Sequence, residues 1–164
     1  MRLFHGSNLQ VATPVLIGQQ RGLDFGPGFY TTSNPRQARA FARSVVRRAG
    51  NGVATVSEYD FDAELAQATL SVKRFVGPDL DWLDFVLANR GSRGGSDHSF
   101  DLVVGPVADD DVFAVLQAYE AGFLDRVQTL AALQARRLYD QYVFTTLNGL
   151  GWLRFVEAAQ EGAR

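Results

Sequence analysis

The sequence predicts an α+β fold in one domain covering residues 1–164. Stretches with the period of a strand and stretches with the period of a helix are mixed along the chain, without the strict alternation of a doubly wound parallel sheet. Hydrophobic residues make up 46% of the chain and charged residues 21%, which is typical of a globular protein. The 164 residues suffice for one domain with a real core, and we find no internal repeat or convincing linker.

Six short segments have the composition or the alternation of strands. Residues 53–61 alternate between apolar and polar, and the apolar run 101–107 is closed by Gly105-Pro106. Loops rich in glycine and polar residues are expected over 8–27 and 91–99. The expected strands are, in order, residues 1–7, 28–32, 53–61, 70–75, 101–107 and 142–145.

Helices are expected where a capping residue precedes a stretch of helical period. Ser33 or Asn34 can cap a helix that has Pro35 at its first position and runs to about Ala49. Asp79 or Asp81 can start a second helix that ends before Gly91. The other expected helices run from 109–111 to about 121, over 124–137, and after residue 145, where Leu150, Leu153 and Phe155 are the apolar positions.

Composition excludes several classes of function. The chain has no cysteine, so disulfides, thiolate metal sites and cysteine nucleophiles are excluded, and a cytoplasmic location is favoured. No apolar run approaches the roughly 20 residues of a membrane span, and the segment Met1–His5 has too few apolar residues for a signal peptide. The net charge of -2 gives no strong field toward nucleic acid, and we expect no membrane partner.

The basic residues are almost all arginine, and several of them fall in the first expected helix. At spacings of three and four, four of these arginines share one helix face, and a fifth follows directly. Such a run indicates either a solvated outer face or a landing surface for an anionic or acidic partner. The residues are Arg36, Arg39, Arg43, Arg47 and Arg48.

Two motifs near the start of the chain are more informative together, in this order, than either is alone. The first is Phe4-His5-Gly6-Ser7, at the end of the first expected strand. The second, residues 26–32, reads Gly-Pro-Gly-Phe-Tyr-Thr-Thr and precedes a helix of small residues. Taken singly, His5 fits a satisfied strand-end histidine, Tyr30 a packed aromatic, and the glycines a turn.

Together the two motifs resemble the NAD-binding core of ADP-ribosyltransferases, in the diphtheria-toxin and poly-ADP-ribose polymerase branch. That branch carries a triad of His, Tyr and then Glu or a substitute. The whole pattern also looks like a small bacterial family of toxin-like proteins. The resemblance implies an ADP-ribosyltransferase-like split β-sheet core with flanking helices, and a mono-ADP-ribosyltransferase that takes NAD as substrate.

The resemblance also implies roles for individual residues. His5 would hydrogen-bond a ribose hydroxyl of NAD, and Tyr30 would stack on the nicotinamide ring. The backbone of Gly6, which lacks a Cβ, would approach the nicotinamide amide, and the Ser7 hydroxyl would add a contact. The remaining residues expected to bind NAD are Gly28, Phe29 and Phe41.

The third member of the triad is expected on the late strand. In the best register Gln141 takes the position of the family's Glu, ahead of Tyr142-Val143-Phe144. A glutamine can hydrogen-bond the ribose but cannot carry charge. Asp140 could, but neighbouring strand residues face opposite sides, so only one of the two should line a cleft shared with His5. We favour Gln141 and keep Asp140 as the alternative.

Other acidic and basic residues have competing interpretations. Asp101 is a further candidate acid or simply a strand-start residue that caps a turn. Asn89-Arg90 could hold a phosphate or Asp101, or Arg90 could meet the helix dipole. Asp109-Asp110-Asp111 fits ordinary helix capping, so we expect no metal. The dinucleotide fingerprint of a Rossmann fold is absent.

Two functions therefore remain open. The first is a mono-ADP-ribosyltransferase, of the kind found in toxins, that modifies an unidentified protein or nucleic acid and has an antitoxin as partner. The second is a binding module with the same fold that retains NAD or ADP-ribose binding, or only protein contacts. Gln141 in place of Glu is the feature that favours the second.

Overall fold

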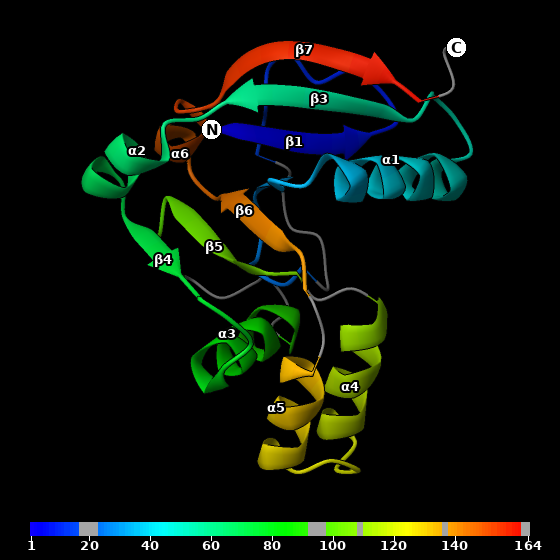
Figure 1. The fold of residues 1–164 in the computed structure, drawn as a ribbon, viewed down its shortest axis with the longest axis vertical. Helices are drawn as coiled ribbons and strands as arrows, with labels where there is room; N and C mark the ends of the chain where they lie inside the picture. The colour runs from blue at the N-terminus through cyan, green and yellow to red at the C-terminus, as the bar shows by residue number, and fades with distance from the viewer. Residues whose placement is uncertain (17–22, 92–97, 108–109, 136–137, 162–164) are drawn as a thin grey trace.

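The computed structural model describes residues 1–16, 23–91, 98–107, 110–135 and 138–161. It has the predicted α+β character, with two small sheets and six helices in these parts of the chain. The sheets form the upper and middle layers of the molecule, and helices α3 (Leu80–Gly91), α4 (Asp110–Glu120) and α5 (Arg126–Gln134) form its lower end (Figure 1). None of the described helices is both long and apolar enough to span a membrane.

The upper sheet is antiparallel and has the strand order β1-β3-β7. The middle sheet has the order β2-β6-β5-β4, with β4 and β5 parallel and the other pairs antiparallel. An isolated bridge between Phe4 and Thr32 joins β1 to the end of β2. The strands are β1 (Arg2–Ser7), β2 (Phe29–Thr31), β3 (Thr55–Asp60), β4 (Val72–Arg74), β5 (Leu102–Pro106), β6 (Asp140–Phe144) and β7 (Arg154–Gln160).

The first helix is the one that the sequence predicts. Asn34 caps it by accepting hydrogen bonds from the backbone N–H groups of Arg36 and Gln37, Pro35 opens it, and Gly50 ends it with a φ of 67°. It packs on β1 and β3 through Ala38 and Ala42. The helices are α1 (Pro35–Ala49), α2 (Ala63–Thr69), α3 (Leu80–Gly91), α4 (Asp110–Glu120), α5 (Arg126–Gln134) and α6 (Leu147–Leu150).

The middle sheet separates two hydrophobic cores, which explains why β5 and β6 are apolar on both faces. β6 contributes Tyr142 and Phe144 to one core and Val143 to the other. The first core lies between the two sheets and includes Leu3, Phe29, Tyr59, Phe61, Tyr142 and Phe144. The second core lies between the middle sheet and helices α3, α4 and α5, and includes Phe25, Trp82, Leu83, Val86, Val103, Val112, Leu116, Leu133 and Val143.

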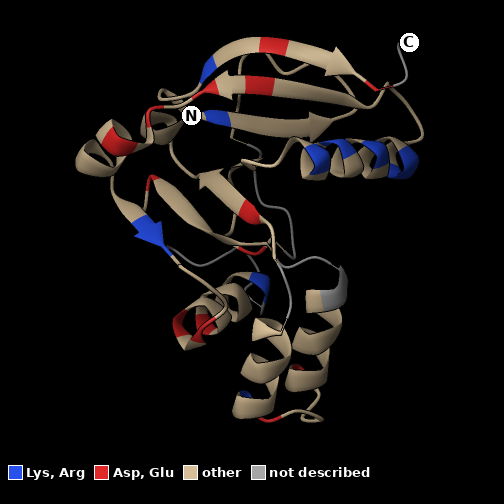
Figure 2. Cartoon of the chain, viewed as in Figure 1, with Lys and Arg blue, Asp and Glu red and all other residues tan. Residues whose placement is uncertain are grey.

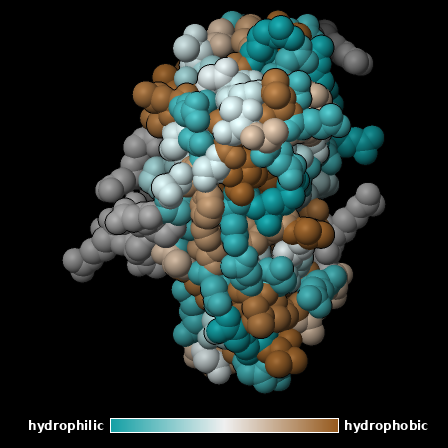
Figure 3. Space-filling view, turned by 90° about the vertical axis from the view of Figure 1, so that its left-hand side faces the viewer, coloured by the Kyte–Doolittle hydropathy of each residue, from teal (hydrophilic) through white to brown (hydrophobic). Residues whose placement is uncertain are grey.

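The surface of the helical end is partly apolar. Figure 3 shows hydrophobic residues reaching the surface near this end of the molecule. Phe123, in the turn between α4 and α5, exposes 82% of its surface, and Val127 on α5 exposes 77%.

One prediction of secondary structure was wrong, and one helix was missed. The helix expected after residue 145 ends at Leu150, and Arg154–Gln160 instead forms β7 against β3. Leu150 and Leu153 have the spacing of a helix, but Phe155 does not share their face, and pairing with a distant strand decided the outcome. Helix α2, capped by Asp62, was not expected from the sequence.

Candidate functional site

His5 faces the first core from β1. Its ring stacks on Phe29 at a centroid distance of 4.3 Å, and its Nδ1 lies 2.7 Å from the backbone oxygen of Tyr30. A carbonyl can only accept, so Nδ1 carries the proton and the neutral ring has its lone pair on Nε2. Among the described residues, no hydrogen-bond partner contacts Nε2. Nε2 is therefore the atom of this side chain that can accept a hydrogen bond from a ligand.

Burial lowers the pKa of His5 below its ordinary value of 6.5, and the bond to Tyr30 opposes this only in part. Below about pH 6.5 the unfolded chain therefore binds more protons than the folded chain. The stability contributed by this effect is fully present above that pH and is lost as the pH falls through the folded pKa.

We therefore expect a pH-dependent difference between the wild type and His5→Gln. The wild type should lose more free energy of unfolding between about pH 7.5 and pH 5.5 than His5→Gln does, because Gln does not titrate. Urea unfolding of both proteins at both pH values measures this. Equal losses in the two proteins would contradict the assignment.

Tyr30 points to the other side of β2, toward the second core. Its hydroxyl donates to the backbone oxygen of Gly26 at 2.7 Å and accepts from the N–H of Phe25 at 3.2 Å. Burial raises the pKa of this phenol, so it remains a donor at neutral pH. The side chain thus fastens the segment that precedes its own strand.

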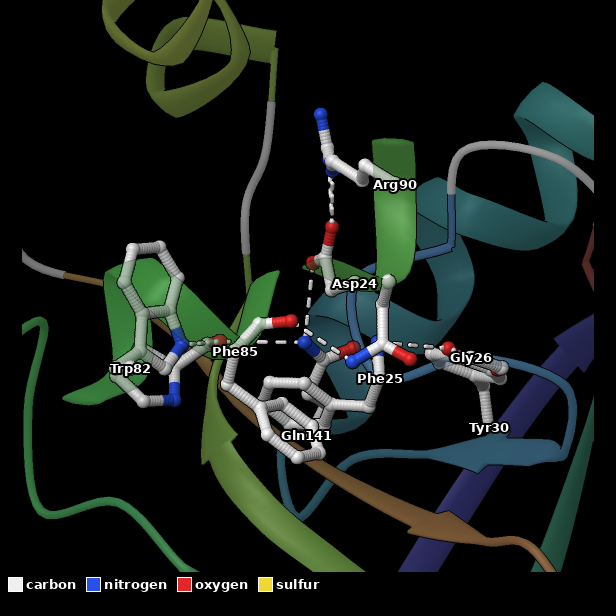
Figure 4. Close-up of polar contacts among 10 residues, drawn as sticks. Asp24, Phe25, Gly26, Tyr30, Trp82, Phe85, Arg90 and Gln141 are labelled. Atoms are coloured by element: carbon white, nitrogen blue, oxygen red, sulfur yellow. Dashed lines mark hydrogen bonds and ion pairs between the residues drawn. The ribbon is translucent and has the colours of Figure 1, made fainter. Parts of the chain in front are cut away.

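Gln141 is buried at the start of β6 and lies on the same sheet face as Tyr30. Tyr30 pairs with Val143, and Gln141 is two residues from Val143, so alternation puts all three on one face. The Gln141 amide nitrogen donates to Asp24 Oδ2 at 3.1 Å and to the Pro106 backbone oxygen at 3.2 Å. The indole of Trp82 donates to the same oxygen at 3.1 Å (Figure 4).

Asp24 and Arg90 form a buried ion pair beside Gln141. The guanidinium donates from Nε at 2.8 Å and from Nη2 at 2.6 Å, both to Asp24 Oδ1. The Asp24 side chain is 7% exposed and the Arg90 side chain 14%. The Arg90 guanidinium also lies over the ring of Phe113, 5.0 Å from its centre. A buried carboxylate held by a guanidinium and an amide is a strongly organised polar site.

His98 borders this site next to Phe25 and Gly26. Its Nε2 lies 3.0 Å from the backbone oxygen of Phe25, and its Nδ1 is buried without a hydrogen-bond partner in the described structure. Neither Asp24 nor His98 was singled out from the sequence. Asp24 carried one signal, a charged residue placed directly before the aromatic, glycine-framed segment.

The structure brings Tyr30 and Gln141 of the predicted triad together, whereas His5 lies on the other side of β2. Tyr30 and Gln141 both bind the Asp24–Gly26 segment, as Figure 4 shows. His5 reaches this cluster only through the backbone of Tyr30. The expectation that His5 and Gln141 line one cleft with their side chains does not match this arrangement, because the two face different cores.

The two alternative acids lie elsewhere. Asp140 accepts hydrogen bonds from the Ser33 N–H and hydroxyl and lies 2.9 Å from the Thr32 hydroxyl, so it fastens the turn before α1. Asp101 lies at the opposite end of the sheet from Gln141. It accepts from Thr146, Ser71 and Asn148, and these bonds, that from Thr146 most of all, lower its pKa. Asp101 directly precedes β5, as expected, and holds the segments around Ser71 and Thr146 together; Arg90 pairs with Asp24 and not with it.

The other residues expected to bind NAD serve packing or lie apart. A Cβ on Gly6 would lie 2.1 Å from the Ala38 backbone oxygen, so Gly6 admits α1. A Cβ on Gly28 would lie 2.8 Å from the Phe144 backbone oxygen. Ser7 reaches Asn8 Oδ1 at 3.4 Å. Phe41 is 50% exposed on α1.

No metal site is evident in the part of the chain that the structure describes. Within those residues, no group of three or more His, Asp or Glu side chains is placed to hold a metal ion. Asp110 begins α4, and Asp109 lies outside the described residues. The site is therefore one of hydrogen bonds, a buried ion pair and aromatic rings.

Comparison with known proteins gives one match. The model of a family described as "Protein of unknown function (DUF3990)" matches residues 1–155. The matched region contains β1 to β6 and every residue of the polar cluster. No curated protein and no solved structure matches the chain.

Proposed function

The chain belongs to the DUF3990 family, and we propose that it is an NAD-dependent mono-ADP-ribosyltransferase that modifies a macromolecule. The observation that carries the proposal is the convergence of Tyr30 and Gln141 on the Asp24–Gly26 segment. Both residues were assigned to NAD from the motifs alone, 111 positions apart, and they occupy neighbouring strands of one sheet. The two sheets joined at Phe4 and Thr32 also suit an ADP-ribosyltransferase-like split core.

The proposed chemistry breaks the bond between ribose C1 and the nicotinamide nitrogen. The bonding electron pair leaves with nicotinamide, whose ring becomes neutral, and positive charge develops on the ribose as in glycoside cleavage. A nucleophile of the acceptor then forms the new bond at C1 and loses its proton. The protein must hold the ribose and stabilise the developing charge.

The cluster offers groups for these tasks on the Tyr30 face of the sheet. His5 faces the other core, so its part in the proposal is to hold the backbone of Tyr30 through Nδ1. Gln141 uses its amide nitrogen on Asp24 and Pro106, so its oxygen is the atom that would accept from the ribose. Asp24 supplies, through Gln141, the negative charge that glutamine lacks. The Tyr30 ring would stack on nicotinamide.

One observation favours the second function, a binding module without turnover. The Asp24 carboxylate is paired with Arg90, which offsets the charge available to the ribose. With Gln141 uncharged, such a site would hold NAD or ADP-ribose without cleaving it. The two functions differ in one measurable quantity, the release of nicotinamide from NAD.

We expect the purified protein to release nicotinamide from NAD, with Asp24→Asn, Gln141→Ala and His5→Ala each slower by roughly 10- to 100-fold. Each change removes a hydrogen bond or a charge worth about 1.5–3 kcal/mol in the transition state. Tyr142→Phe is the matched control, since Tyr142 is the next residue on β6 and faces the other core. Chromatographic detection of nicotinamide and calorimetric titration with NAD are the measurements.

The outcomes separate the hypotheses. Binding of NAD without release of nicotinamide would favour the binding module. Neither binding nor release by a folded protein would overturn the enzyme and the NAD-binding module, and would leave only ADP-ribose binding or protein contacts of the second function. If the enzyme is a toxin, we expect an antitoxin protein that covers the Tyr30–Gln141 cluster, in a cytoplasmic setting.

A further inference from the structure

Helix α1 presents a basic face that the described residues neutralise only in part. It carries five arginines and no acidic residue, and Figure 2 shows the basic residues gathered along it. The residues at positions 36, 39, 43 and 47 follow one another at helical spacing, and position 48 adds a fifth. At 1.5 Å per residue, Arg36 and Arg47 are about 16 Å apart along the axis. All five side chains belong to exposed residues.

The ion pairs on this face show how its guanidinium groups meet an anion. Arg39 and Arg43, one turn apart, bind the two oxygens of the same Glu161 carboxylate at 3.0 and 2.6 Å. Arg36, Arg47 and Arg48 have no ion pair with any carboxylate of the described chain. Two arginines thus already converge on one anion, and three more are available along the same helix.

Aromatic side chains and a hollow accompany the arginines. Phe41 is 50% exposed, and the Arg48 guanidinium lies 5.6 Å from the centre of its ring. At the start of α1 a cavity of about 560 Å³ is lined by Ser33, Asn34, Arg36, Leu138, Tyr139 and Asp140. Tyr139 is 45% exposed and lies two positions before Gln141 in the sequence.

We propose that the exposed face of α1 and the cavity at its start bind single-stranded nucleic acid. The planar guanidinium fork matches a phosphate, and the arginines follow a line as the phosphates of a strand do. Phe41 lies beside Arg48, and Tyr139 lines the cavity together with Arg36; exposed rings next to guanidinium groups are an arrangement on which bases stack. An acidic polypeptide would use the charges but would have no need of Tyr139 and Phe41, so the rings favour nucleic acid.

The position of the cavity gives this surface a relation to the candidate site. Asp140, which lines the cavity, directly precedes Gln141 on β6. A nucleotide in the cavity would therefore lie next to the strand that carries Gln141. That the bound strand is the acceptor of ADP-ribose rests on the proposed function; the binding itself does not.

The test of the basic face is fluorescence anisotropy with labelled oligo-dT and oligo-rU of about 20 nucleotides, without NAD. The triple variant Arg36→Gln, Arg47→Gln, Arg48→Gln is compared with a control of equal net charge, Arg74→Gln, Arg126→Gln, Arg154→Gln. We expect the α1 variant to bind roughly 10- to 100-fold more weakly and the salt slope of log K to shrink by about 2. The control should bind as the wild type does.

The test of the rings uses single alanine variants of Tyr139 and Phe41, with Phe123→Ala as the exposed aromatic control on the far hairpin. We expect the first two to weaken binding roughly 5- to 100-fold and the control to leave it unchanged. No binding by the wild type would overturn the proposal. The proposal would also be overturned if the α1 triple variant and its control weakened oligonucleotide binding equally. It would be overturned as well if polyglutamate bound as tightly as the oligonucleotides and its binding did not change in the Tyr139 and Phe41 variants.

Failure of the proposed function is distinguishable from failure of this surface. If the protein binds the oligonucleotide but releases no nicotinamide, the proposed surface stands and the proposed enzymatic activity fails. If it cleaves NAD but binds no oligonucleotide, only the proposed surface fails. NAD that is radiolabelled in its ADP-ribose part, added to the bound strand, tests the acceptor role directly, because transfer would label the oligonucleotide.

Discussion

Replacement of Arg90 by alanine is expected to lower the free energy of unfolding by about 3–5 kcal/mol, because it leaves the Asp24 carboxylate buried without the guanidinium. Two donors of Arg90 lie 2.8 and 2.6 Å from one oxygen of Asp24, and Asp24 is only 6% exposed. A charge in such a place cannot recover its hydration without opening the structure. The loss should appear in urea unfolding at neutral pH.

The control is an ion pair of the same chemistry at the surface. Arg126 pairs with Asp84, and both side chains are about half exposed. Arg126→Ala should therefore cost at most about 1 kcal/mol. Adding Asp24→Asn to Arg90→Ala should recover part of the loss, since a neutral amide is cheaper to bury than a carboxylate. An Arg90→Ala protein as stable as Arg126→Ala would show that the buried pair contributes little.

Replacement of Gly6 by alanine is expected to destabilise the protein by about 3 kcal/mol, the upper part of the usual range for overpacking. The new Cβ would lie 2.1 Å from the Ala38 oxygen and 2.9 Å from the Ala42 nitrogen. Both atoms belong to the backbone of α1, which cannot turn aside as a side chain can. The whole helix would have to move away from β1.

The matched control is Gly77→Ala. Nothing lies within 4 Å of the Cβ that alanine would place there, so it should change the free energy of unfolding by less than about 0.5 kcal/mol. Thermal and urea unfolding of the two variants give the comparison. If Gly6→Ala unfolds like Gly77→Ala, the contact between β1 and α1 is looser than these distances indicate. A large loss would also mean that Gly6 variants cannot test NAD binding by themselves.

The sequence by itself determined those elements whose cues act within a few residues. Asn34, Pro35 and Gly50 set the bounds of α1, because a cap satisfies backbone groups of its own turn. Alternation along Thr55–Asp60 determined β3. The motifs also identified Tyr30 and Gln141, which prove to share one cluster.

Only the tertiary structure decided what depends on partners far along the chain. Arg154–Gln160 is a strand because β3 supplies its hydrogen-bond partners, although the sequence predicts a helix there. Arg90 meets Asp24 across 66 positions, and no local pattern predicts that pair. His5 and Gln141 face different cores because β2 lies between them, which depends on how the two sheets are joined. Helix caps and local hydrogen bonds depend on residues that are close in the sequence. The order of strands in a sheet and the pairing of buried charges depend on segments far apart in the sequence, which compete for the same partners.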